Sequence, residues 1–495
     1  MLFVLFRRLD CGNLPNTGRC DILNCICEIL LQEGGDVRMK MVKDRDFYLL
    51  LLSISLPIAL QNMVSQGVSL IGTLMLGQLG STQIAASSLG NQPLFIFTLL
   101  TIGLAAGGSV LTAQYWGKGD TGAIRRLTAI VLRYSILASL LFAALVGFFP
   151  KVVMGFFTSD PEVLAEGALY LRITALAYPF YGITNTTLAI LRSVERVWMS
   201  FWITLVSLLT TTFMNWVLIF GRFGLPAMGI SGAAWAQVIA RVVSFLAVLL
   251  YMGFHEDRIR IRLRDFFVHD PVLQGDFLRN ASPVILNEFM WGFGSSAQAM
   301  ILGHLGKQAT TAHSISSALM QMAMVFIYGV TSASSVVMGK TLGANRMDNV
   351  RPYVNTLMIL SAFIGLTAAG FILLTKGFFI EWYQIDAATK ALTHQFMYIA
   401  AAVAMMQCLY SPVSLGALRA GGDTKFVLFL DVFFLWVLAL PLGFMAAQVW
   451  QFAFTPVYLL LKFDEPLKVL LAYWRAGGDR WIRNLTREIP VNGEV

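Results

Sequence analysis

From Phe47 onward, apolar segments long enough to cross a membrane recur along the chain, separated by short loops that contain Gly, Pro or charged residues. A hydrocarbon core of about 30 Å needs about 20 apolar residues in a helix, and backbone exposed to lipid must be hydrogen-bonded within its own segment. Charged residues make up only 13% of the 495, against roughly 25% in a soluble domain. The sequence therefore predicts an all-α polytopic membrane protein.

We expect twelve transmembrane helices. Their predicted positions, to within several residues, are 47–74, 85–112, 124–148, 164–189, 197–220, 231–253, 280–304, 312–338, 353–375, 391–417, 424–445 and 448–470. Lys and Arg gather in one set of loops and at both ends of these spans, including a tail from Lys462 onward. Because such residues collect in cytoplasmic segments, this bias predicts a multi-pass protein of the cell (inner) membrane with both termini cytoplasmic.

The second half of the chain repeats the first. When Pro57 is aligned with Pro283, the LGQLG segment ending at Gly80 meets the LGHLG segment ending at Gly306 without a gap. Further matches are Ala86 with Ala312, Gly103 with Gly329, Gly117 with Gly343 and, after a shift of one residue, Arg192 with Arg419. Because six spans separate the copies, both have the same orientation. We therefore expect two parallel-repeat six-helix bundles around a central cleft in which a substrate binds.

The repeat also divides the chain into domains. We expect residues 39–253 to form the first bundle, 254–280 a cytoplasmic linker and 281–470 the second bundle. Residues 463–490 mix Lys and Arg with Leu and aromatic residues, which favours a short amphipathic helix on the inner surface; we expect residues 471–495 to form a cytoplasmic amphipathic tail. Residues 1–38 show no periodicity, so we expect them to be a disordered or mis-annotated extension.

Short motifs accompany the two copies. They are LGQLG…AASSLGNQ, AQYWGKGD, LGHLG…AHSISS, MGKTLGAN, LRAGGDTK and the run GISGAA at 229–234. In this order and spacing they resemble the multidrug and toxic compound extrusion (MATE) family over about residues 40–490. The resemblance implies twelve helices in two bundles. It also implies export of amphipathic, often cationic compounds against an inward flow of H⁺ or Na⁺.

Few acidic residues lie within the expected spans, and each is costly there unless it faces protein or water. Glu288 lies in the seventh span and Asp431 in the first half of the eleventh. A buried carboxylate can hold and release a proton, or bind Na⁺ or an organic cation; alternatively, it forms a structural ion pair. The repeat places Asn62 opposite Glu288, and the first span contains no acid. Many MATE relatives have an Asp in that span, so the resemblance moves the expected ion site to the second half.

Other residues complete the predicted ion-coupling or substrate-binding site. They are Asn62, Asn185, Asn215, Asn287 and Trp291. Asparagines within spans also link neighbouring helices by hydrogen bonds, and a tryptophan there can equally pack in the core or against lipid. We predict no catalytic residue, no metal ligands and no cofactor, with H⁺ or Na⁺ as the coupling ion.

The energy source follows from what the sequence contains. No Walker A motif occurs in it, so an ion gradient is the expected driving force. We interpret the chain as a non-enzyme: an antiporter that exports amphipathic, cationic drugs or metabolites by alternating access. The alternative is a flippase for lipid-linked saccharide precursors, which requires cations such as Arg133, Arg172 and Arg241 to gather in the cleft. We expect a monomer that binds a small molecule and the lipid bilayer but no nucleic acid.

Overall fold

The computed structural model describes residues 41–77, 81–256, 258–259, 263–268, 270–383 and 385–487. The expected extension at 1–38 lies outside these residues, so its prediction is not tested. Within the described ranges every regular element is a helix, and no β-strand occurs.

The first half of the chain forms helices α3 to α11. Their bounds are α3 Arg45–Gly77, α4 Ser81–Gly90, α5 Gln92–Lys118, α6 Thr121–Phe148, α7 Pro150–Gly155, α8 Pro161–Thr174, α9 Ala177–Ser193, α10 Val197–Phe220 and α11 Gly229–Phe254. The sharp reversal between α5 and α6 shows how the sequence sets these limits. Gly119 adopts the left-handed conformation (φ 81°) that ends α5, and the Asp120 side chain caps α6 by accepting from the Ala123 N–H.

The second half forms α12 to α20, preceded by the short 3₁₀ helix η1. The bounds are η1 Leu263–Phe267, α12 Pro271–Leu305, α13 Lys307–Ala323, α14 Val325–Gly343, α15 Met347–Glu381, α16 Ala387–Ser411, η2 Pro412–Leu418, α17 Thr424–Phe433, η3 Phe434–Ala439, α18 Leu440–Phe444, η4 Met445–Val449, α19 Phe454–Leu460 and α20 Asp464–Gly477. The three elements η2, η3 and η4 are π-helical, a rare geometry that occurs mostly as bulges within α-helices and frequently at functional sites.

Nine segments of the described chain have the length and hydropathy of a membrane span. The remaining three of the twelve expected crossings are helical but interrupted or more polar. They are formed by α8 with α9, by α12, and by α19 with α20. The expected end of the last span at residue 470 falls inside α20, which continues to Gly477.

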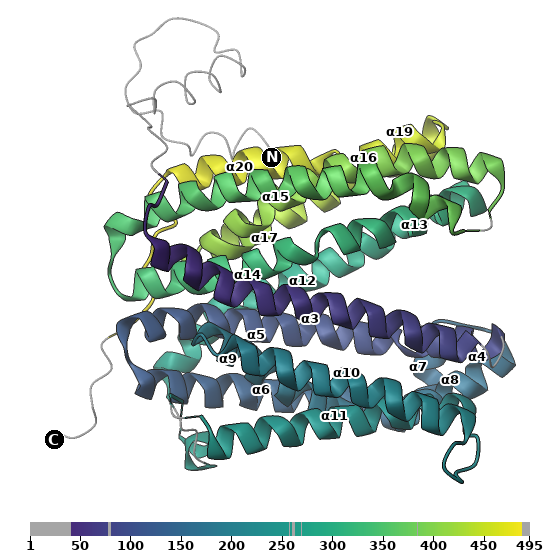
Figure 1. Ribbon diagram of the computed structural model, residues 1–495, viewed down its shortest axis with the longest axis horizontal. Helices are drawn as coiled ribbons and strands as arrows, with labels where there is room; N and C mark the ends of the chain where they lie inside the picture. The colour runs from purple at the N-terminus through teal and green to yellow at the C-terminus, as the bar shows by residue number, and fades with distance from the viewer. Residues whose placement is uncertain are drawn as a thin grey trace, which may run out of the picture. The chain divides into compact units, whose positions relative to one another are not determined.

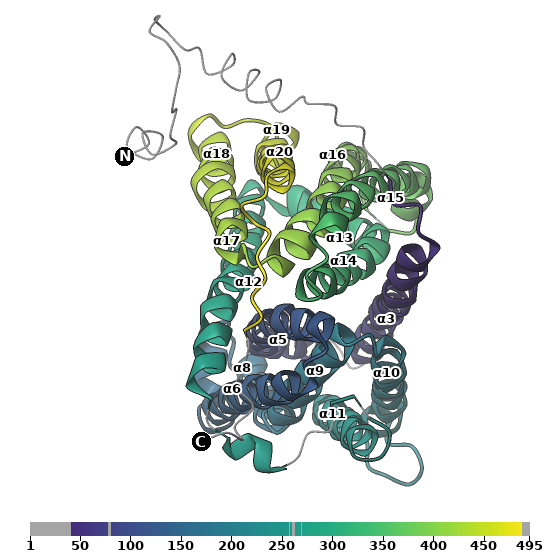
Figure 2. The same cartoon turned by 90° about the vertical axis from the view of Figure 1, so that its left-hand side faces the viewer.

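The two halves of the chain form separate bundles, as Figures 1 and 2 show by the purple-to-teal and green-to-yellow helices. They meet where α5 packs against α12 and α14, and where α14 packs against α3. The repeat makes α5 the counterpart of α14, and α3 the counterpart of α12. The contacts between the halves are therefore related by the duplication, and the prediction of two parallel six-helix bundles is confirmed.

The closest approach between the bundles lies where α5 crosses α14. A Cβ added to Gly343 would overlap the carbonyl group of Gln114, and one added to Gly117 would overlap the carbonyl group of Lys340. The repeat aligns Gly117 with Gly343 and Gln114 with Lys340, so each contact is the counterpart of the other. Only glycine lets the two backbones approach this closely.

The C-terminal segment 478–487 lies against both halves beside this crossing. The Gln114 side chain donates to the Ala420 carbonyl at 2.7 Å and accepts from the Leu485 N–H at 2.6 Å. One side chain of the first half therefore holds both the turn before α17 and the end of the chain. We call this end of the helical domain the tail face. The opposite end, which carries α7 and the loop after α10 (Figure 1), is the far face.

Two further contacts fix the same segment. The Arg487 guanidinium donates to Asp276 of α12 at 2.7 Å, and the Lys118 ammonium of α5 donates to the Arg487 carbonyl at 3.0 Å. Trp481 is fully buried and packs against Gly421. The last described residues thus act as a strap across the tail face, with contacts on a helix from each bundle.

The crossing of α5 and α14 predicts that alanine substitutions at two glycines will lower the stability of the protein to different extents. Gly343→Ala should lower the free energy of unfolding by about 1–3 kcal/mol, because the added methyl group forces packed backbones apart. Gly370→Ala on α15 is the control, since a Cβ there meets no atom within 4 Å. Thermal unfolding of the purified proteins in detergent measures both, and equal stability of the two variants would contradict the close crossing.

Candidate substrate and ion-coupling sites

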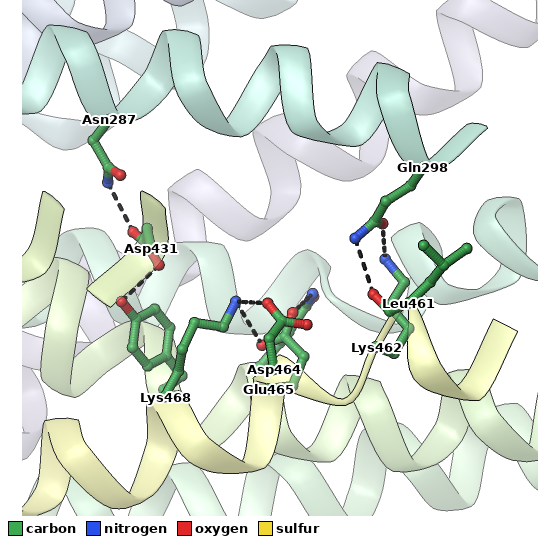
Figure 3. Close-up of polar contacts among 10 residues, drawn as sticks. Asn287, Gln298, Asp431, Leu461, Lys462, Asp464, Glu465 and Lys468 are labelled. Atoms are coloured by element: carbon green, nitrogen blue, oxygen red, sulfur yellow. Dashed lines mark hydrogen bonds and ion pairs between the residues drawn. The ribbon is translucent and has the colours of Figure 1, made fainter. Parts of the chain in front are cut away.

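The second half contains a connected set of buried polar groups around Asp431 of α17. Its Oδ2 accepts from the Asn287 amide of α12 at 2.8 Å, and its Oδ1 accepts from the Tyr410 hydroxyl of α16 at 2.8 Å. Figure 3 shows the amide of Asn287 directed at this carboxylate. Asn287 and Tyr410 are buried. Two of the residues predicted for the ion site, Asp431 and Asn287, therefore bind each other directly.

Lys468 of α20 lies beside this set and is itself surrounded by acids. Its Nζ lies 2.9 Å from Asp464 Oδ2 and 3.3 Å from Glu465 Oε2, and none of these three side chains is more than 9% exposed. The ammonium also lies 5.6 Å from the centre of the Tyr410 ring, and Gln407 donates to Glu465 at 2.9 Å. Buried charges of opposite sign must pair in this way to remain ionised.

The break between α19 and α20 brings these charges into the domain. Asp464 and Glu465 lie in the first turn of α20, where the helix dipole stabilises negative charge. In the break, Lys462 donates to the Gln298 side chain at 2.7 Å, and Gln298 donates to the Leu461 carbonyl at 3.0 Å (Figure 3). A crossing that is interrupted here can therefore place four charged side chains among protein groups instead of lipid.

The sequence prediction missed this cluster and is corrected by it. It counted the cations from Lys462 onward with a cytoplasmic tail. In the structure Lys468 and its two acids are buried inside the second bundle. The signal in the sequence was the spacing of Asp464 and Lys468, since side chains four residues apart lie on one face of a helix and can pair.

Glu288 forms a separate ion pair. Its Oε1 lies 3.1 Å from Nη1 of Arg419, which follows η2, and the two side chains are 17% and 8% exposed. Glu288 therefore faces protein, not lipid. The structural ion pair that the sequence left open as an alternative is present, with Arg419 as the partner, and the coupling role of Glu288 remains a prediction.

The other predicted residues do not gather around Asp431. Asn185 and Asn215 line a cavity in the first half. Asn62 is half-buried on α3, and Trp291 is 51% exposed on α12. The structure thus divides the expected single site into a charged network in one half and a cavity in the other.

This cavity has a volume of about 460 Å³ and lies inside the first bundle, not in the cleft between the bundles where a substrate was expected. Helices α3, α9, α10 and α11 form most of its wall. Arg192 and Arg241 line it, and no acidic residue does so within the described part of the chain. The Arg241 guanidinium lies 4.5 Å from the centre of the Tyr181 ring, and Arg192 donates to the Ser200 hydroxyl at 3.3 Å.

The three arginines that a flippase would need do not form a cluster. Arg241 lines the cavity, whereas Arg133 donates to the Val268 carbonyl at 3.1 Å and Arg172 is exposed. The geometry therefore does not favour the flippase alternative. Among the residues that the structure describes, no group of three His, Cys, Asp or Glu side chains could hold a metal ion.

Comparison with known proteins assigns the family. The MatE family model matches residues 57–217 and 283–445, so the two matched segments begin at Pro57 and Pro283, the prolines that the repeat aligns. The chain belongs to the MatE family. Its members are multidrug efflux transporters of the membrane and not enzymes, and they bind small-molecule substrates.

Individual MatE relatives cover most of the chain. It is 27% identical over 422 residues to the probable multidrug resistance protein NorM of Rhizobium meliloti, which covers 81% of this chain and 88% of the relative. It is 24% identical over 398 residues to the multidrug resistance protein PmpM of Pseudomonas aeruginosa, at 80% and 83% coverage. A solved structure of a mutant MATE transporter VcmN from Vibrio cholerae matches with a TM-score of 0.80 at 16% identity, covering 87% and 96%. At that identity the structural likeness shows the fold alone.

The buried ion pairs of this MatE transporter predict a strong dependence of stability on Lys468. Lys468→Met should lower the free energy of unfolding by about 3–5 kcal/mol, because it leaves Asp464 and Glu465 buried without a cation. Lys390→Met is the matched control: its partner Glu381 is 68% exposed, so the loss should stay below about 1 kcal/mol. Thermal unfolding in detergent compares the two, and a larger loss in the control would rule out the buried pairing.

Proposed function

We propose that this MatE transporter is an antiporter that exports amphipathic drugs or metabolites by alternating access in exchange for H⁺ or Na⁺. Family membership supports the efflux. The observation that carries the coupling mechanism is the buried contact of Asp431 with Asn287 and Tyr410, at 2.8 Å each. A carboxylate in a membrane domain is costly unless it has a function or a partner, and the nearby cation Lys468 is already paired with two other acids.

Binding of the coupling ion would change the contacts of Asp431. The ionised carboxylate accepts hydrogen bonds from helices α12 and α16 simultaneously. A proton on either oxygen turns that oxygen into a donor and removes an acceptor, so one of the two hydrogen bonds must reverse its direction or break. Sodium would act differently, as a further partner of the carboxylate oxygens; the Asn287 Oδ1 is buried without a hydrogen-bond partner among the described groups and offers a second ligand. Either ion shifts the equilibrium only by binding one conformation more tightly.

We place the tail face in the cytoplasm of the cell, with the transporter in the inner membrane, both termini cytoplasmic and the protein a monomer. The charge distribution supports this orientation, because cations concentrate at cytoplasmic ends of spans. The residues at this face include Lys118, Arg125, Arg126, Arg351 and Arg487. The close crossing of α5 and α14 at the same face corresponds to a conformation closed toward the cytoplasm.

Asp431→Asn tests the coupling mechanism. The variant should reach the membrane in normal amount, because an amide keeps most of the hydrogen bonds, while gradient-driven transport should fall at least about tenfold, as expected for loss of an essential proton-transfer group. Transport of a fluorescent drug into everted vesicles, with the pH and Na⁺ gradients collapsed separately, measures the effect and identifies the ion. Asp479→Asn, a change at an exposed acid, should transport normally, and normal transport by Asp431→Asn would refute the role of Asp431.

Glu288→Gln tests the remaining predicted carboxylate. We expect this variant to abolish export while the protein still reaches the membrane. Because the substitution also removes the partner of buried Arg419, unfolding temperature is measured beside drug resistance. Loss of resistance with unchanged stability supports a transport role, whereas normal resistance removes Glu288 from the mechanism.

A further inference from the structure

The repeat relates the two arginines of the cavity to the two buried cations of the second half. The alignment that pairs Arg192 with Arg419 also pairs Arg241 with Lys468. Each cation also lies over a tyrosine ring, Arg241 over Tyr181 of α9 and Lys468 over Tyr410 of α16, although these two tyrosines are not at aligned positions. Both halves therefore retain a cation at each of two equivalent positions.

The halves differ in what neutralises these cations. In the second half, Arg419 pairs with Glu288 at 3.1 Å, and Lys468 pairs with Asp464 at 2.9 Å and with Glu465 at 3.3 Å. Each buried cation there has a carboxylate supplied by the protein itself.

In the first half, the positions of those acids hold neutral residues. The counterpart of Glu288 is Asn62, and the counterparts of Asp464 and Glu465 are Gln237 and Val238. Within the described part of the chain, no acid forms an ion pair with Arg192 or Arg241. The cavity thus has two positive charges and no protein counter-charge, a costly arrangement in a membrane domain unless an anion or water compensates.

The cavity also presents hydrogen-bonding atoms that have no partner in the described protein. They are Gln61 Oε1, Thr184 Oγ1 and Asn215 Oδ1, all buried and all belonging to residues that line the cavity. Buried polar atoms are normally hydrogen-bonded. Because two of these atoms are amide oxygens, a ligand that satisfies them must carry hydroxyl or amine donors.

Apolar side chains form the rest of the wall, among them Val68, Leu94, Leu188 and Leu208. A volume of about 460 Å³ lies in the range of sites for drug-sized molecules. The wall therefore accommodates an amphipathic compound and not only an inorganic ion.

We propose that this cavity binds an organic anion: a carboxylate or phosphate ester that also carries hydroxyl or amine donors and an apolar group. Arg241 is the main anchor, because its guanidinium makes no hydrogen bond or ion pair to the described protein, whereas Arg192 already donates to Ser200. The ligand supplies the negative charge that Glu288, Asp464 and Glu465 supply in the second half. This inference rests on the proposed export function and names its substrate class, in place of the cationic class implied by the family resemblance.

Binding of three compounds that share one scaffold tests the charge preference. The probes are 4-nitrophenyl β-D-glucuronide, the corresponding neutral glucoside and the cationic glucosaminide, measured by equilibrium dialysis against the purified full-length protein in phosphatidylcholine nanodiscs. We expect the glucuronide to bind at least about tenfold more tightly than the other two, the factor that one charge-assisted hydrogen bond supplies. Equal or tighter binding of the glucoside or glucosaminide would overturn the proposal.

Variants then locate the site. Arg241→Gln should reduce glucuronide binding at least about tenfold and leave glucoside binding unchanged. Arg241→Lys should retain part of the glucuronide binding that Arg241→Gln loses. Arg172→Gln, at an exposed position, should bind the glucuronide as the unchanged protein does. Thermal unfolding confirms that each variant is folded. If Arg241→Gln fails to fold, Arg192→Gln and the milder Arg241→Lys carry the test. Glucuronide binding that is insensitive to all three substitutions would place the site elsewhere and refute the proposal.

The same anion chemistry occurs in lipid headgroups, so the dialysis is repeated in nanodiscs containing phosphatidylglycerol. If phosphatidylglycerol weakens glucuronide binding to the unchanged protein but not to Arg241→Gln, the anion site stands and its occupant is the lipid. If glucuronide binding is the same in both kinds of nanodisc, the occupant is a soluble compound. Because dialysis requires no ion gradient, its result is independent of the antiport mechanism. Failure of gradient-driven transport with intact glucuronide binding would refute the coupling and leave the cavity assignment standing.

Discussion

A charge placed inside a membrane domain must be compensated, because hydrocarbon cannot solvate it, and this requirement organises the interior of the transporter. In the second bundle the compensation is internal: Lys468 has two acids, Arg419 has Glu288, and Asp431 has two hydrogen-bond donors. The break between α19 and α20 places Asp464 and Glu465 in the first turn of α20, where they pair with Lys468. The helices of this bundle are thus joined by polar contacts between buried side chains.

The duplication explains how two unlike sites arise in one fold. Both copies retain the cations, but only the second retains acids beside them. Removing the acids from one copy leaves a positively charged cavity in which a mobile anion can take their place. On the two proposals made above, the first half would accept the exported compound and the second half the coupling ion. The two halves are joined by the close packing of α5 against α14.

The sequence predicted the parts of this structure that depend on period and repetition. Apolar length predicted the crossings, and the repeat of Pro57 at Pro283 predicted the paired bundles. The cost of an intramembrane acid pointed to Glu288 and Asp431, but the sequence did not place Asn287 beside Asp431. The sequence prediction failed where tertiary contacts determine the surroundings of a residue. The sequence does not show that Asp464, Glu465 and Lys468 are buried together, because their burial depends on a helix break and on their mutual pairing. The cavity with Arg241 was equally hidden, because its wall combines α3 with the much later helices α9, α10 and α11.

The strap formed by residues 478–487 has a practical consequence for experiments on this protein. Its final described residue, Arg487, is held by Lys118 of one bundle and Asp276 of the other. Any rocking motion that parts the bundles at this end must first detach this segment. A label attached within residues 478–487 would load contacts that such a motion has to break. Reporters attached within the loop after α10, at the opposite end of the domain, would not load these contacts of the strap.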